Sequence, residues 1–218
     1  MKITGLERQK KNRHRVSVYL DGDFAFGVNE ETVFRFGLHK GMELDEAVRA
    51  DITREDQLVQ AKLAAERLLA ARMRSEQELR QRLRQKEFSP EVIDATIATF
   101  LRVHLLDDAE FARLWVRDRL RLRPRAASAL RRELRAKGVR EDIVTMVLHE
   151  AFEERQDIDV ARDLAAAYRR KHPGISGDVL RRRLAGFLQR KGYSASVVYD
   201  VINEFATGMG DDDAETGE

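Results

Sequence analysis

The side chains that could support acid–base or metal chemistry are scattered along this sequence. Its histidines have no partner at the spacing of a metal site; they are His14, His39, His104, His149 and His172. The pair His149-Glu150 lacks the second histidine of a zinc-protease helix. These residues therefore predict neither a metal centre nor a catalytic base with its nucleophile.

The remaining candidates for enzyme chemistry have simpler explanations. Asp107-Asp108 could be a metal pair, but Asp107 and Glu110 have the spacing of a helix-capping box. Asp211–Asp213 lies in an acidic, glycine-rich segment that cannot hold a site in place. No glycine-rich phosphate loop ending in Lys-Ser or Lys-Thr is present. We therefore expect no enzyme activity, no cofactor and no metal.

Arginine is the residue type whose placement points to a function. The formal net charge is only +2, but cations dominate between residues 113 and 140 and again between 169 and 191. Arginine binds phosphates and carboxylates with two parallel hydrogen bonds, and it stacks on bases. Two separate clusters favour binding to a polyanion over a merely solvated surface.

Several of these cations recur at matching positions. Arg80 and Arg84 lie one helical turn apart, as do Arg131 and Arg135 at an offset of 51 residues. Regularly spaced cations suit a regularly spaced anionic partner, either nucleic-acid phosphates or the acidic surface of a helical protein polymer. The candidate binding residues are Arg80, Arg84, Lys86, Arg123, Arg125, Arg131, Arg132, Arg135, Lys137, Arg181, Arg182, Arg190 and Lys191.

The first fifty residues differ from the rest of the chain. Val16–Leu20 and Phe24–Val28 alternate apolar and polar residues around Asp21-Gly22, which predicts a β-hairpin. Lys2–Arg8 could add a third strand, and Asn29 is placed to cap a short helix that ends at Gly37. The basic stretch from Lys10 to Arg15 is either a solvated loop or a polyanion contact.

From about Thr53 the pattern is helical and repeats. Leu79, Leu83, Lys86 and Phe88 correspond to Leu130, Leu134, Lys137 and Val139, and again to Leu184, Leu188, Lys191 and Tyr193. Leucines four apart place one apolar stripe on a helix, and a period near 50 residues is typical of a helical repeat array. Aromatic residues at the apolar positions are expected in the core: Phe88, Phe111, Trp115, Tyr168, Phe187, Tyr193 and Phe205.

The residues between helices define the unit. Gly138 and Gly192 stand where a helix would end in a left-handed residue, and the first copy has Glu87 there, so its turn should be either strained or differently wound. Ser89-Pro90 predicts the start of the third helix, and Ser75 with Glu78 has capping-box spacing. We expect three helices in each repeat.

The predicted fold is mainly α: three tandem three-helix repeats in an elongated or curved array after a small β-hairpin-containing module. The expected bounds are 1–52 for the β-rich module, 53–104, 105–155 and 156–206 for the repeats, and 207–218 for a disordered acidic tail. The absence of cysteines, of a secretory signal and of an apolar stretch of about 18 residues predicts a cytoplasmic protein without membrane contact. We expect a monomer.

Four segments of the sequence resemble the RecX family. RMRSEQELRQRL (Arg72–Leu83) is similar to the motif of the family's first repeat, and LLDDAEFARLWVRDRL (Leu105–Leu120) resembles that of its second. RRELRAKGV (Arg131–Val139) and FLQRKGYS (Phe187–Ser194) resemble the ending of its repeated helices. The sequence departs from the family at Arg123-Pro124, where a Gly-Pro pair is expected.

The resemblance implies a partner and an activity. It implies binding in the groove of the RecA–DNA filament, with inhibition of filament extension, ATPase, strand exchange and coprotease activity. Weak, sequence-independent binding to single- and double-stranded DNA is also expected from the arginines. Two alternatives remain open: a helix-turn-helix-like transcription factor, or a non-enzymatic scaffold. The acidic third helix after Gly138 disfavours the former, since a recognition helix carries few acids.

Overall fold

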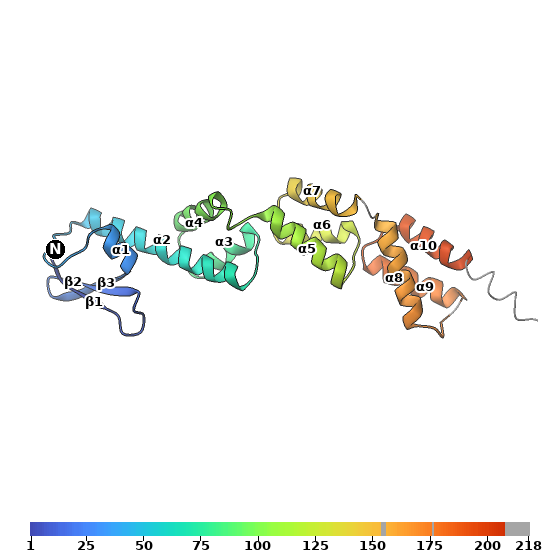
Figure 1. The fold of residues 1–218 in the computed structure, drawn as a ribbon, viewed down its shortest axis with the longest axis horizontal. Helices are drawn as coiled ribbons and strands as arrows, with labels where there is room; N and C mark the ends of the chain where they lie inside the picture. The colour runs from blue at the N-terminus through green and yellow to red at the C-terminus, as the bar shows by residue number, and fades with distance from the viewer. Residues whose placement is uncertain (154–155, 176, 208–218) are drawn as a thin grey trace, which may run out of the picture. The chain divides into compact units, whose positions relative to one another are not determined.

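The computed structural model describes residues 1–153, 156–175 and 177–207 (Figure 1). The chain divides into two compact units, residues 1–106 and 107–218. Within the described residues no helix has the length and apolar character that a membrane span requires. Thr207 is the last residue of helix α10, and the remainder of the segment predicted to be a disordered tail lies outside the described residues.

The N-terminal module is a three-stranded antiparallel sheet in the order β1-β2-β3, formed by Ile3–Arg8, Arg15–Leu20 and Asp23–Asn29. Asp21 and Gly22 both have positive φ, at 51° and 103°, as the tight turn of the predicted hairpin requires. The hairpin and its third strand are thus confirmed. Val18, Val28 and Ile52 lie in one buried cluster beneath the sheet.

Helix α1 (Glu30–Arg35) begins after Asn29 and ends before Gly37, which has a φ of 59°. Asn29 occupies the capping position, but its side chain makes no capping hydrogen bond. Its amide instead donates to the buried carboxylate of Asp56, 2.8 Å away, and its backbone N–H donates to the same oxygen at 2.6 Å. Asn29 therefore ties the sheet to the longer helix that contains Asp56 rather than capping α1 with its side chain.

Helix α2 (Glu46–Ala71) runs through residues 52 and 53, the predicted boundary between the β-rich module and the first repeat. No glycine or proline interrupts it, so nothing in the sequence ends the helix there. Ile52, in its first half, packs into the core of the β module, and Ala65, in its second half, packs into the core of the first repeat. One helix thus serves both parts of the first unit.

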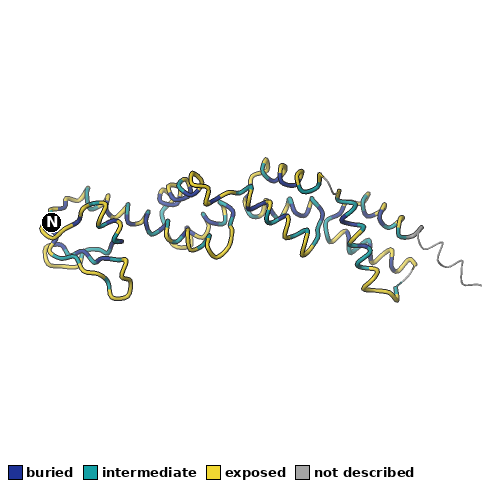
Figure 2. Tube along the Cα trace, in the orientation of Figure 1, coloured by how far each residue is buried: buried dark blue, intermediate teal, exposed yellow. Residues whose placement is uncertain are grey.

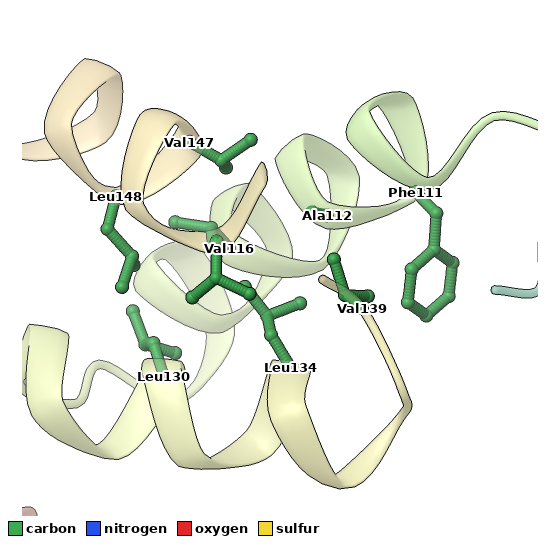
Figure 3. Close-up of a cluster of buried hydrophobic side chains, with 9 residues drawn as sticks. Phe111, Ala112, Val116, Leu130, Leu134, Val139, Val147 and Leu148 are labelled. Atoms are coloured by element: carbon green, nitrogen blue, oxygen red, sulfur yellow. The ribbon is translucent and has the colours of Figure 1, made fainter. Parts of the chain in front are cut away.

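Each repeat contains three helices, as predicted. The first is formed by the second half of α2 with α3 (Glu76–Arg84) and α4 (Pro90–Arg102). The second contains α5 (Asp108–Leu122), α6 (Ala127–Ala136) and α7 (Glu141–Phe152), and the third contains α8 (Asp157–Lys171), α9 (Gly177–Arg190) and α10 (Ala195–Thr207). The buried segments of each group face its interior (Figure 2). In the second repeat, Leu130 and Leu134 meet Val116 and Leu148 in such a core (Figure 3).

The helix ends follow the predicted chemistry. Ser75, Ser89 and Asp107 each accept a hydrogen bond from a backbone N–H in the first turn that follows. All three middle helices end with the same backbone hydrogen bond, from Phe88, Val139 or Tyr193 to the leucine five residues earlier. The left-handed residue before that bond is Glu87, Gly138 or Gly192, with φ of 65°, 79° and 94°.

Candidate nucleic-acid and protein interface

The middle helix of the second repeat separates its leucines from its arginines. Leu130 and Leu134 are fully buried, while Arg131, Arg132 and Arg135 lie on the other side of α6. Arg131 pairs with Glu141 of α7, and Arg135 approaches the same carboxylate at 3.5 Å. Arg132 is exposed and has no ion pair among the described residues. Only part of this cationic face is therefore available to a partner.

The cations of the first repeat are likewise divided between paired and unpaired side chains. Arg80 is held between Glu76, at 2.7 Å, and Asp94, so its side chain is only 27% exposed. These hydrogen-bonded carboxylates raise the pKa of Arg80 even though burial opposes them. Arg84 and Lys86 are exposed, and neither forms an ion pair within the described part of the chain.

In the third repeat the cations of α9 are mostly exposed. Arg181 lies 3.8 Å from Asp178, one turn earlier, and this contact is exposed to solvent. Arg182 and Arg190 are exposed and have no acidic partner in the described ranges. Exposed pairs of the Arg181 kind contribute little to stability, so all three arginines can reorient toward an anion.

The junction between the second and third repeats gathers candidates that are distant in the sequence. The end of α9 meets the start of α6, where the N–H of Ala126 donates to the carbonyl of Lys191 at 3.2 Å. Arg123 and Arg125 lie close enough to Lys191 to lower the pKa of its ammonium, although burial is the larger cause. Arg125 has Glu133 as a counter-ion at 3.3 Å. Three cations thus share one junction.

Lys137, the lysine that recurs in the repeat, does not simply point into solvent. Its ammonium lies 4.1 Å from the centre of the Trp115 ring, and the Arg119 guanidinium lies at the same distance from that ring. The recurring Lys191 lies 5.6 Å from the Phe187 ring. These cation–π contacts orient both lysines over the apolar core.

Sequence reasoning did not single out a row of arginines on α5. Arg113, Arg117 and Arg121 follow one another at four-residue intervals, so they lie on one side of the helix. Arg113 forms a paired contact with Glu150 at 2.9 and 3.2 Å, whereas Arg117 has no ion pair within the ranges described. The four-residue spacing was visible in the sequence and was the signal that could have identified the row.

The described residues contain no group of three histidine, cysteine or acidic side chains that could hold a metal ion. The features of the described surface that could bind a partner are its cations and its exposed ion pairs. This arrangement can bind anions and acidic protein surfaces, and it presents no convergent set of reactive groups among the residues described.

Comparison with known proteins gives a consistent set of relatives. The chain matches the model for the regulatory protein RecX N-terminal domain over residues 1–45, and the RecX first, second and third three-helix domains over residues 61–100, 107–148 and 154–202. A protein named regulatory protein RecX from Bacillus velezensis is 35% identical over 216 residues, which cover 98% of this chain and 80% of that protein. Its namesake from Bacillus cytotoxicus is 33% identical, over 93% of this chain and 76% of the relative.

Two solved structures resemble the fold. A crystal structure of regulatory protein RecX superposes with a TM-score of 0.72 at 30% identity, and the match covers 93% of this chain and 98% of the other. A crystal structure of RecX from Lactobacillus salivarius gives a TM-score of 0.62 at 18% identity over 70% of this chain and 99% of that one, which supports the fold alone.

Proposed function

This chain belongs to the RecX family of regulatory proteins, and on that premise we propose that it is a negative regulator of the RecA recombinase. It binds the groove of the RecA–DNA filament through the arginine-rich faces of its helical repeats. Its occupation of the groove inhibits filament extension, and with it ATPase, strand exchange and coprotease activity. It acts in the cytoplasm as a monomer, by binding rather than by catalysis.

The observation that carries this proposal is the set of cations without an internal counter-ion in the described residues of all three repeats. Among the predicted binding residues they include Arg84, Lys86, Arg132, Arg182 and Arg190. A filament presents the same surface at fixed intervals, so several weak contacts can act together and raise the affinity for filament over free RecA subunits.

Some of the candidate contacts are to DNA phosphates. Such contacts are independent of sequence and weaken as salt rises, because binding releases counter-ions. The third helices do not suit base reading: Glu141, Asp142 and Glu150 are exposed on α7, and acids there repel DNA. This observation favours filament regulation over the alternative of a sequence-specific transcription factor.

The test is RecA's DNA-dependent ATPase, followed with single-stranded DNA and increasing amounts of the purified protein. Inhibition at fewer than one molecule per RecA subunit, with shorter filaments by electron microscopy, is the expected result. Unchanged hydrolysis and unchanged filament length would instead favour a general helical DNA-binding protein or scaffold.

A further inference from the structure

The second repeat has a groove on α5 and α7 that is lined by residues other than the cations of the middle helices. Between α5 and α7 lies a hollow of about 480 Å³ with apolar side chains from Val116, Leu120, Val147 and Ala151. A second hollow of about 390 Å³ continues onto α8 and shares Leu120 and Ala151 with the first. Both lie within the unit formed by residues 107–218. Because they share two lining residues, we treat them as one apolar groove.

The rim of the first hollow is cationic. Arg113, Arg117 and Arg121 line it, and Glu150 is the acidic residue that lines it with them. Glu150 is already paired with Arg113, and Arg121 has only a distant contact of 3.9 Å with Asp118. Arg117 is exposed and forms no ion pair with the residues described. Two of the three arginines are therefore available to a negatively charged partner.

The spacing of the row limits the shape of that partner. Residues four apart on a helix rise by about 6 Å, so the three arginines extend over about 12 Å. Acidic residues four apart on another helix repeat at the same distance. A helix that carries such acids beside an apolar stripe would place its apolar residues on the groove floor and its carboxylates on the rim.

We propose that this groove is a docking site for an acidic amphipathic helix of a protein partner. Nucleic acid fits less well, since the floor of both hollows is apolar, and the acids of the partner helix would lie at the arginine rim of the first hollow rather than near Asp163 of the second. The site is distinct from the cations of the middle helices, and it extends the proposed function by giving the protein a second, peptide-binding contact.

The test uses a fluorescein-labelled peptide of about 18 residues, long enough for appreciable helix, with leucines in one stripe and glutamates four apart. Anisotropy with the full-length protein should show binding that weakens as salt rises. A matched peptide with lysine at every glutamate position should bind much more weakly. The double variant Arg117→Glu with Arg121→Glu should bind the acidic peptide about three- to tenfold more weakly.

Reversal of charge on both partners makes the test specific. The double variant should recover affinity for the lysine peptide, a gain that a misfolded protein could not show. Arg183→Glu on α9 is the matched control and should leave binding of the acidic peptide unchanged, because Arg183 is exposed and lies outside the groove lining. Equal binding of both peptides, or equal losses in the groove variant and the control, would overturn the proposal. So would unchanged peptide binding together with loss of oligonucleotide binding in the groove variant, since the row would then be a nucleic-acid contact.

Discussion

The indole N–H of Trp115 donates a 2.9 Å hydrogen bond to the carboxylate of Glu133, across the contact between α5 and α6. Arg119 donates to the same carboxylate oxygen at 2.8 Å. Burial alone would raise the pKa of Glu133, but the hydrogen bonds from Arg119 and Trp115 and the charges of Arg119 and Arg125 outweigh it and lower the pKa below its ordinary value of 4.5. Glu133 thus links α5 to α6 and is the counter-ion of both Arg119 and Arg125.

Replacement of this carboxylate should weaken the second repeat. Glu133→Gln removes the charge from hydrogen bonds in a partly buried site, at a cost of about 1–3 kcal/mol in the free energy of unfolding. Trp115 is the single tryptophan of the chain, so urea denaturation followed by its fluorescence reports on this repeat directly. Glu141→Gln, which removes a more exposed carboxylate, should cost less.

The same residue sets a pH dependence. Because the pKa of Glu133 is lower in the folded state, its stabilisation is complete above pH 4.5 and is lost as the pH falls through the lowered value. The wild-type protein should therefore lose its stability advantage over Glu133→Gln on acidification below about pH 4.5. A difference between the two proteins that stayed constant from pH 7 to pH 3 would contradict this assignment.

Glu87 offers a test of backbone strain. It adopts the left-handed conformation, with φ of 65°, that glycine provides in the other two repeats. Glu87→Gly should raise the free energy of unfolding by about 0.5–1 kcal/mol, since relief of the left-handed strain exceeds the entropy that glycine adds to the unfolded chain. The reciprocal change Gly138→Glu should destabilise the second repeat. Thermal denaturation of both variants, each compared with the wild-type protein, measures the two changes in stability.

Gly192 combines strain with close packing. Its φ is 94°, and a Cβ at this position would lie 2.8 Å from the Cβ of Ala129 on α6. Gly192→Ala should therefore destabilise the junction of the second and third repeats by about 1–3 kcal/mol. Gly174→Ala is the control, because it has open space around it and no positive φ. Equal stabilities of the two variants by urea denaturation would refute the packing argument.

The repeat architecture could be predicted from sequence because it depends on local patterns. Leu79, Leu130 and Leu184 mark the same buried position, and the serine caps and left-handed glycines depend on a few neighbouring residues. The continuity of α2 could not be predicted in this way. It depends on the packing of one helix into two separate cores, that of the β module and that of the first repeat. The buried carboxylate of Asp56 binds Asn29 across 27 positions of the chain, a contact that no local pattern indicates.

The candidate interface was predictable in its residue type but not in its details. The arginine clusters are evident from composition, but which arginines are free depends on acids brought near by folding. Arg131 and Arg80 are paired with Glu141 and Asp94 of the following helices, whereas Arg132 is not paired among the described residues. Such pairings require the packed arrangement of the helices.

This division between paired and free arginines predicts their effects on DNA binding. Arg132→Glu should weaken binding to a single-stranded oligonucleotide about three- to tenfold at low salt, and equally for unrelated sequences. The slope of log affinity against log salt concentration should become less steep by about the contribution of one phosphate contact. Arg80→Glu should instead act mainly on stability, since Arg80 is enclosed by two acids. Anisotropy and urea denaturation together distinguish the two effects.

The most direct test of the central claim is inhibition of RecA's DNA-dependent ATPase by charge-reversed variants. We compare wild-type protein with Arg132→Glu in the second repeat, Arg182→Glu in the third, and the two combined. If exposed cations of successive repeats act together on one filament, the combined variant should lose more inhibition than either single variant, with losses of binding free energy that are about additive. Full inhibition by the combined variant, or no inhibition by the wild-type protein, would contradict the account.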